Sequence, residues 1–138
     1  MNQVLKNLFT LLGAVQAQPE ANFDLSSYAR KEPCGTLFCT AGLAASLPHF
    51  QSQGMALIPW STNTFMVEIN GLDIDVREAD TDKMFGPDAW YSLFATYADG
   101  RRDESLGSGS YGSGRAMTDK ALAIARIQAQ IAAVEQGE

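Results

Sequence analysis

Long apolar runs, cysteine and histidine are scarce in this sequence, and each shortage argues against a class of protein. The 138 residues contain no stretch of about 18 apolar residues, so we expect no membrane-spanning helix. Two cysteines cannot build the disulfide framework of a small secreted protein, so a reducing, cytoplasmic location is the simpler expectation. A single histidine leaves too few ligands for a structural zinc site.

Positive charge is also in short supply. The chain has 10 Lys and Arg residues against 16 Asp and Glu residues, which gives a formal net charge of −6. Neighbouring cations occur only at Arg30-Lys31 and Arg101-Arg102, whereas a protein that neutralises phosphates needs them clustered. Nucleic acid is therefore disfavoured as the main ligand, and a bias toward basic partners remains.

What is present is the composition of an ordinary globular chain. Hydrophobic residues make up 46% of the sequence and charged residues 19%, and the length predicts a single domain over 1–138. Asn7 and Thr10 interrupt the apolar stretch near the start, so we expect a helix there rather than a signal peptide.

Four segments carry the pattern of helices. The first has Asn2 as a candidate cap, the second is rich in small residues, the third begins at Pro87 and the last follows Thr118. These patterns predict helices over about 3–16, 36–46, 87–98 and 118–135. In the last helix, an inward stripe is expected at Ala121, Ile124, Ile127, Ile131 and Val134.

The pair Asn70-Gly71 between two alternating segments is the clearest local signal. Asn-Gly suits both positive-φ positions of a type I′ turn, so it predicts an antiparallel hairpin of 64–69 and 72–77 with Ile69 opposite Leu72. A third strand is possible near 56–59. The predicted fold is α+β, with four helices packed against this small hairpin. The side chains expected to face the core are Phe65, Val67, Ile69, Leu72, Ile74 and Val76.

Residues 101–116 are rich in Gly and Ser, and this composition predicts a flexible loop. Gly107 to Gly112 matches G-x-G-x-x-G by letter, but it follows no strand, so a dinucleotide site is not expected. The loop could instead close over a partner or an anionic ligand. The candidate binding residues are Trp60, Arg101, Arg102, Tyr111 and Arg115.

The two cysteines and the histidine are the candidate catalytic groups. A helix over 36–46 would separate Cys34 from Cys39 by about 8 Å and His49 from Cys39 by about 15 Å. That separation disfavours a disulfide, a metal site and a Cys–His dyad. If the protein is an enzyme, the candidate is Cys34, because a helix N-terminus lowers the pKa of a thiol.

Acidic residues form a second candidate cluster for chemistry. Carboxylates bind Ca²⁺ and Mg²⁺, but Asp73 and Asp75 lie on the hairpin face expected to meet water, and no EF-hand spacing occurs. We therefore expect no metal and no cofactor. The acidic residues considered are Glu68, Asp73, Asp75, Asp80 and Asp82.

Two motifs carry a resemblance to other proteins. Residues 23–28 read F-D-L-S-S-Y, and residues 34–42 read C-G-T-L-F-C-T-A-G. This pattern resembles an uncharacterised group of phage and bacterial proteins that carry F-D-M-x-x-W followed by C-G-T-x-x-C-x-A-G; Leu25 and Tyr28 depart from it. The resemblance implies a phage or prophage origin and assigns no activity.

Together these patterns favour a small non-enzymatic interaction protein, phage-encoded, that modulates or inhibits a host protein. No catalytic constellation is visible, and the charge is acidic. Association with copies of itself stays open. The alternatives are a binder of a small anionic, nucleotide-like ligand with 101–116 as its lid, and a thiol enzyme that uses Cys34.

Overall fold

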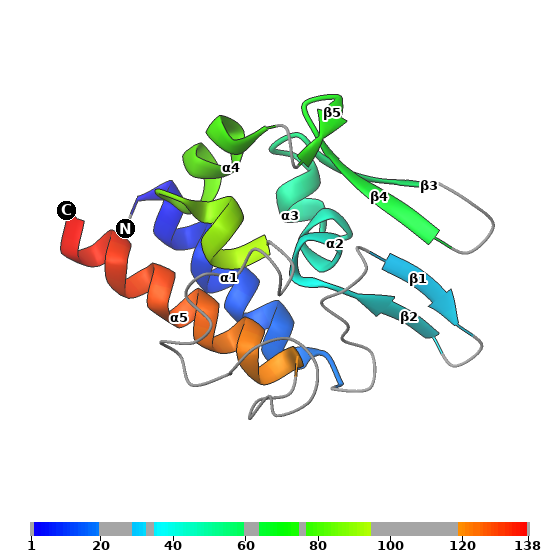
Figure 1. Ribbon diagram of the computed structural model, residues 1–138, viewed down its shortest axis with the longest axis horizontal. Coiled ribbons are helices and arrows are strands. Elements are labelled where there is room, and N and C mark those ends of the chain that lie inside the picture. The colour runs from blue at the N-terminus through cyan, green and yellow to red at the C-terminus, as the bar shows by residue number, and fades with distance from the viewer. Residues whose placement is uncertain are drawn as a thin grey trace.

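The chain combines helices with an antiparallel sheet, which confirms the α+β class (Figure 1). None of the helices in the described ranges has the length and apolar character needed to cross a membrane. The computed structural model describes residues 2–19, 29–32, 35–59, 64–74, 77–94 and 119–137. In chain order its elements are α1 (Gln3–Ala17), β1 (Ala29–Glu32), β2 (Gly35–Phe38), α2 (Thr40–Ala45), α3 (Pro48–Gln51), β3 (Met55–Pro59), β4 (Thr64–Ile69), β5 (Leu72–Asp73), α4 (Glu78–Phe85), the π-helix η3 (Trp90–Phe94) and α5 (Asp119–Gly137).

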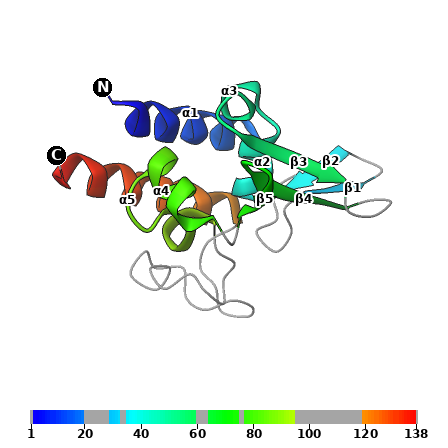
Figure 2. The ribbon, with the colours of Figure 1, turned by 90° about the horizontal axis from the view of Figure 1, so that it is seen from above.

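Helix α1 forms as predicted. The Asn2 side chain accepts a hydrogen bond from the Leu5 N–H at 2.8 Å, which satisfies one of the free donors at the start of the helix. Helix α1 packs against α4 and α5, and it lies beside α5 in both views (Figures 1 and 2). The Lys120 ammonium donates to the Gln16 carbonyl at 3.0 Å, so the start of α5 meets the end of α1 and the two helices run antiparallel.

The strands form one antiparallel sheet in the order β2-β1-β4-β3. Strand β5 also pairs with β4, at the end of β4 opposite to the end that pairs with β1. Strand β4 is therefore central, and Figure 1 shows β3 at the outer border of the sheet, away from β1 and β2. The strand expected near 56–59 is confirmed as β3.

Helix α2 joins the sheet to the helices. Every residue of α2 is buried, and the helix packs against β3, β4 and α1. Its small side chains permit this, because Ala41, Gly42, Ala44 and Ala45 let neighbouring backbones come close. One buried apolar cluster runs from α1 through α2 to the inner face of β4, where Val67 and Ile69 are fully buried.

The prediction of a helix over 36–46 is wrong at its start. Residues Gly35–Phe38 form strand β2, and the helix begins only at Thr40. The cap is Cys39, whose sulfur accepts from the Gly42 N–H at 3.4 Å. Pairing with β1 supplies the backbone partners of residues 35–38, so tertiary contact overrides helix propensity there.

The predicted hairpin is right in its turn and wrong in its length. Asn70 and Gly71 both have positive φ, at 52° and 87°, and Ile69 is opposite Leu72. Strand β5 ends at Asp73 and does not reach 77, because the chain turns to bury Ile74 and to begin α4 at Glu78. Leu72 is 51% exposed rather than in the core, since it lies on the border strand beyond the strand that α2 covers.

The last two predicted helices need smaller corrections. Residues 87 and 88 form a turn with Asp88 at φ 58°. Within the predicted helix 87–98, the π-helix η3 occupies residues 90–94. Helix α5 extends to Gly137, with Ala121 and Ile124 only half-buried. The α5 residues that are buried but lie outside the expected stripe are Leu122, Ala123, Arg126 and Gln130.

Candidate functional site

The predicted binding loop, residues 101–116, lies outside the part of the chain that the structure describes. The candidate site residues that lie outside the described part of the chain are Cys34, Trp60, Arg101, Arg102, Tyr111 and Arg115. A reactive Cys34 was expected from a helix N-terminus beside it. That helix start is not formed, because residues Gly35–Phe38 are strand β2.

Cys39 and His49 both have structural contacts. Cys39 is buried and caps α2 through its sulfur. His49 lies on α3, exposed, with its Nε2 atom 2.9 Å from the Asn7 Oδ1 atom and its ring packed edge-on against Phe50. The Cys39 side chain therefore stabilises the start of α2, and the His49 side chain links α3 to Asn7 of α1.

Asn7 is a buried polar residue whose role the sequence did not reveal. Its Nδ2 group donates to the Met84 carbonyl at 2.9 Å and to the Gln53 Oε1 atom at 2.9 Å. A backbone carbonyl can only accept, so the amide must turn its oxygen toward His49. His49 Nε2 must then carry a hydrogen and donate to Asn7. Asn7 thereby ties α1, α3 and α4 together.

A second set of buried polar groups lies on α2, η3 and α5, of which η3 packs against the other two. Arg126 is 1% exposed and its Nη1 group is 3.5 Å from the Leu93 carbonyl oxygen. Gln130 donates to the carbonyls of Phe85 at 3.0 Å and Pro87 at 2.9 Å. Within the described ranges, the buried atoms without a hydrogen-bond partner are Thr40 Oγ1, Ser92 Oγ and Gln130 Oε1.

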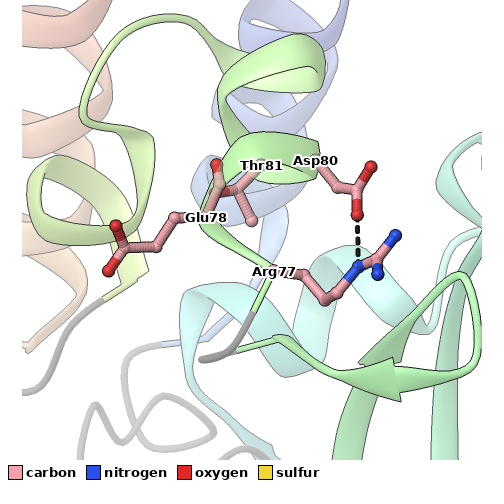
Figure 3. Close-up of polar contacts among 4 residues, drawn as sticks. All are labelled: Arg77, Glu78, Asp80 and Thr81. Carbon is pink, nitrogen blue, oxygen red and sulfur yellow. Dashed lines mark hydrogen bonds and ion pairs between the residues drawn. The ribbon is translucent and has the colours of Figure 1, made fainter.

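The acidic residues do not assemble a metal centre in the described ranges. No group of three or more His, Cys, Asp and Glu side chains there is placed to hold a metal ion. Asp80 forms an ion pair with Arg77 at the start of α4 (Figure 3). The Thr81 hydroxyl donates to the Glu78 carbonyl at 2.8 Å. These contacts order the first turn of α4.

The β3 edge, meaning the side of strand β3 that faces away from β4, is the most distinctive feature of the described surface. Asn70 N–H donates to the Gly54 carbonyl at 2.9 Å, so Gly54 and Asn70 form a hydrogen-bonded pair of the ladder. Hydrogen-bonded and non-hydrogen-bonded pairs alternate, so Ala56 and Ile58 direct their backbone groups toward β4. Leu57 directs its N–H and C=O outward, and in the described ranges only β4 pairs with β3.

The chemistry of β3 leaves this edge open to another strand. Natural proteins often block sheet edges with charged side chains, yet the sequence of β3 is Met-Ala-Leu-Ile-Pro, without charge. Pro59 removes one donor, but only at the last position. An outward N–H and C=O at Leu57 can therefore form ladder hydrogen bonds with an added strand.

The outer face of the sheet, opposite to the face that α2 covers, carries an apolar pair and an acidic pair. Ile58 is opposite Met66, and both are half-buried without packing against the core cluster. Ala56 is opposite Glu68, which is opposite Asp73, so these three side chains form one row across three strands. Counting outward from the Asn-Gly turn would have placed Glu68 opposite Asp73 from the sequence alone.

Comparison with known proteins adds no assignment. No protein-family model, no curated protein and no solved structure matches this chain. The resemblance of residues 23–42 to a phage and bacterial group therefore stays an expectation.

Proposed function

We propose that this chain is a non-enzymatic interaction protein and that it binds its partner through the β3 edge. The observation that carries the proposal is the outward N–H and C=O of Leu57 on an uncharged border strand. An extended segment that adds to such an edge gains affinity from main-chain hydrogen bonds and specificity from alternate side chains. Binding by addition of a strand to a sheet edge requires no catalytic group.

We further propose that the protein is phage-encoded and modulates or inhibits a host protein. The motif resemblance at residues 23–42 supports the origin. The net charge of −6 supports a partner with a basic surface, because complementary charge speeds encounter and selects among partners. Inhibition would follow if the captured strand belongs to a segment that the host protein needs to move.

Affinity purification from a bacterial host lysate tests the role of the edge. Leu57→Pro removes the outward N–H, and edge strands tolerate proline where that N–H faces water. Leu57→Ala is the matched control, since it shortens the same side chain and keeps the N–H. We expect the wild type and Leu57→Ala to retain a common protein that Leu57→Pro loses. Equal retention by all three chains, or no protein enriched by the wild type, contradicts the proposal.

A second candidate function, binding of a small anionic ligand, is favoured by one observation. The Ser92 hydroxyl is buried without a hydrogen-bond partner in the described ranges, and the neighbouring Leu93 carbonyl lies 3.5 Å from the buried Arg126 guanidinium. Ser92 and Leu93 lie on the π-helix η3, and π-helical turns are frequent at functional sites. Thermal shift with inorganic phosphate and with nucleotides at millimolar concentration tests it. A rise in Tm that Ser92→Ala abolishes supports this function, and an unchanged Tm contradicts it.

A further inference from the structure

The outer face beside the β3 edge specifies which side chains an added strand should carry. Neighbouring strands lie about 4.8 Å apart, and directly opposite residues point to the same face. A strand added beside β3 would therefore continue the row of Ala56, Glu68 and Asp73, and would also continue the row of Ile58 and Met66. The two rows are two residues apart along β3.

The acidic row places two negative charges close together. Ile69 and Leu72 flank a two-residue turn and are hydrogen-bonded to each other in that type of hairpin, so the next pair, Glu68 and Asp73, is of the closer, non-hydrogen-bonded kind. Like charges in that position repel. Among the described residues neither carboxylate has an ion pair, and the nearest described cation along the chain, Arg77, is bound to Asp80 (Figure 3).

Ala56 leaves the path from the edge to this acidic pair clear. An added residue beside Ala56 would lie about 10 Å from β4, two strand spacings away. Since the alanine side chain is one methyl group, a lysine or arginine on the added strand can lie over it and reach Glu68. In the next row, Ile58 and Met66 present apolar surface at the same distance from the edge.

We infer that the partner segment of the proposed function is an extended strand with an apolar residue and a lysine or arginine two positions apart. The apolar residue packs on Ile58 and Met66, and the cation pairs with Glu68 and Asp73. Backbone groups of the same strand bond to Leu57. This inference rests on the proposed function and adds the chemistry of the partner to it.

A second copy of this chain fits the edge less well. Strand β3 contains no lysine or arginine, so antiparallel pairing of two β3 strands would bring no cation to Glu68. Each copy also carries a formal charge of −6, which opposes association. Charge complementarity therefore selects a basic partner over self-pairing.

Cyclic hairpin peptides test this inference with the full chain. One peptide presents a threonine-rich strand with valine and lysine two positions apart, and its twin has glutamate in place of the lysine. Fluorescence anisotropy should show the lysine peptide binding the wild type at least about tenfold more tightly than its twin, as expected for one charge pair. Glu68→Lys should reverse this preference. Glu78→Lys, the same charge change on α4, should preserve it.

The outcomes separate this inference from the proposed function. Loss of preference to the same extent in Glu68→Lys and Glu78→Lys would show that net charge alone attracts the peptide, and would overturn the inference. Failure of both peptides, while a host protein still depends on the Leu57 N–H, would overturn the inference and leave the proposed function standing. A dimer in sedimentation that Leu57→Pro abolishes would show that a second copy occupies the edge, and would overturn it as well.

Discussion

The helical layer, formed by α1, α4 and α5, differs from the β3 edge in whether its polar groups are paired. In the helical layer, the side-chain NH2 groups of Asn7 and Gln130 donate to backbone carbonyls of other elements, and both side chains are buried. On the sheet, the Leu57 backbone groups at the β3 edge and the carboxylates of Glu68 and Asp73 on the outer face have no partner among the described residues. A buried polar group costs free energy when unpaired, whereas one in reach of water does not. The helical layer therefore stabilises the fold, and the β3 edge and the outer face of the sheet remain available for binding.

The largest expected effect lies in the helical layer, at Gly86. Its φ of 96° and extended ψ of 177° are open to glycine only, and an added Cβ would lie 2.6 Å from Val134 Cγ2 and 3.0 Å from Gln130 Nε2. Gly86→Ala should lower the free energy of unfolding by about 3 kcal/mol, from backbone strain and overpacking together. Urea unfolding measures this. Gly13→Ala is the control, since no atom lies within 4 Å of its added Cβ.

A smaller effect is expected when the Asn7 amide is removed. Asn7→Leu keeps a similar volume but leaves the Met84 carbonyl without its side-chain donor and His49 without its acceptor. The expected loss is about 2 kcal/mol, the cost of leaving buried polar groups unpaired. Thr10→Ala, on the exposed side of α1, should change little. Equal stability of Asn7→Leu and the wild type would show that the network does not tie the helices together.

On the outer face of the sheet, a substitution is expected to raise the stability of the protein and not to lower it. Glu68→Gln removes the repulsion from Asp73, so it should raise the free energy of unfolding by about 0.3 kcal/mol while it weakens binding of the lysine peptide. A gain in stability with a loss of binding is the mark of a residue retained for function. Glu78→Gln serves as the control for charge alone. If Glu68→Gln instead destabilises the chain, the carboxylate has a structural role.

The smallest effect concerns the pH dependence of stability at Asp82. Desolvation raises the pKa of its carboxyl, the hydrogen bond from the Ala89 N–H opposes this, and the charges of Asp88 and Glu78 raise the pKa further. Because the raised pKa belongs to the folded state, the stabilisation is fully present below the ordinary pKa of an aspartate. It is lost as the pH rises through the raised value. Asp82→Asn should remove this acid-range dependence, as unfolding from pH 2 to 7 would measure.

Local signals in the sequence predicted the α+β class and some of its elements. The Asn2 cap predicted α1, and Asn70-Gly71 predicted the turn, because these features depend on a few neighbouring residues. Strand β2 was missed because residues 35–38 are held by pairing with β1, a contact that no local pattern records. Gln130 and Arg126 were missed since apolar periodicity does not identify buried polar side chains.

The binding residues predicted from the sequence do not include the β3 edge. Glu68 and Asp73 were considered only as metal ligands, with Asp73 expected on the solvent-facing side of the hairpin, and the structure places the two opposite each other. That β3 is the border strand depends on the sheet order, which brings β1 to the other side of β4. Sheet order follows from the packing of the whole chain, so the edge could not be read from the segment 56–59 alone.

Amide hydrogen exchange of the free protein tests the central claim most directly. The alternation of β3 places the N–H groups of Ala56 and Ile58 against β4 and the N–H of Leu57 at the β3 edge. We expect Leu57 to exchange about 100-fold faster than Ala56 and Ile58 when followed by NMR. Protection of Leu57 equal to that of its two neighbours would show that the edge is already covered, and would contradict the account.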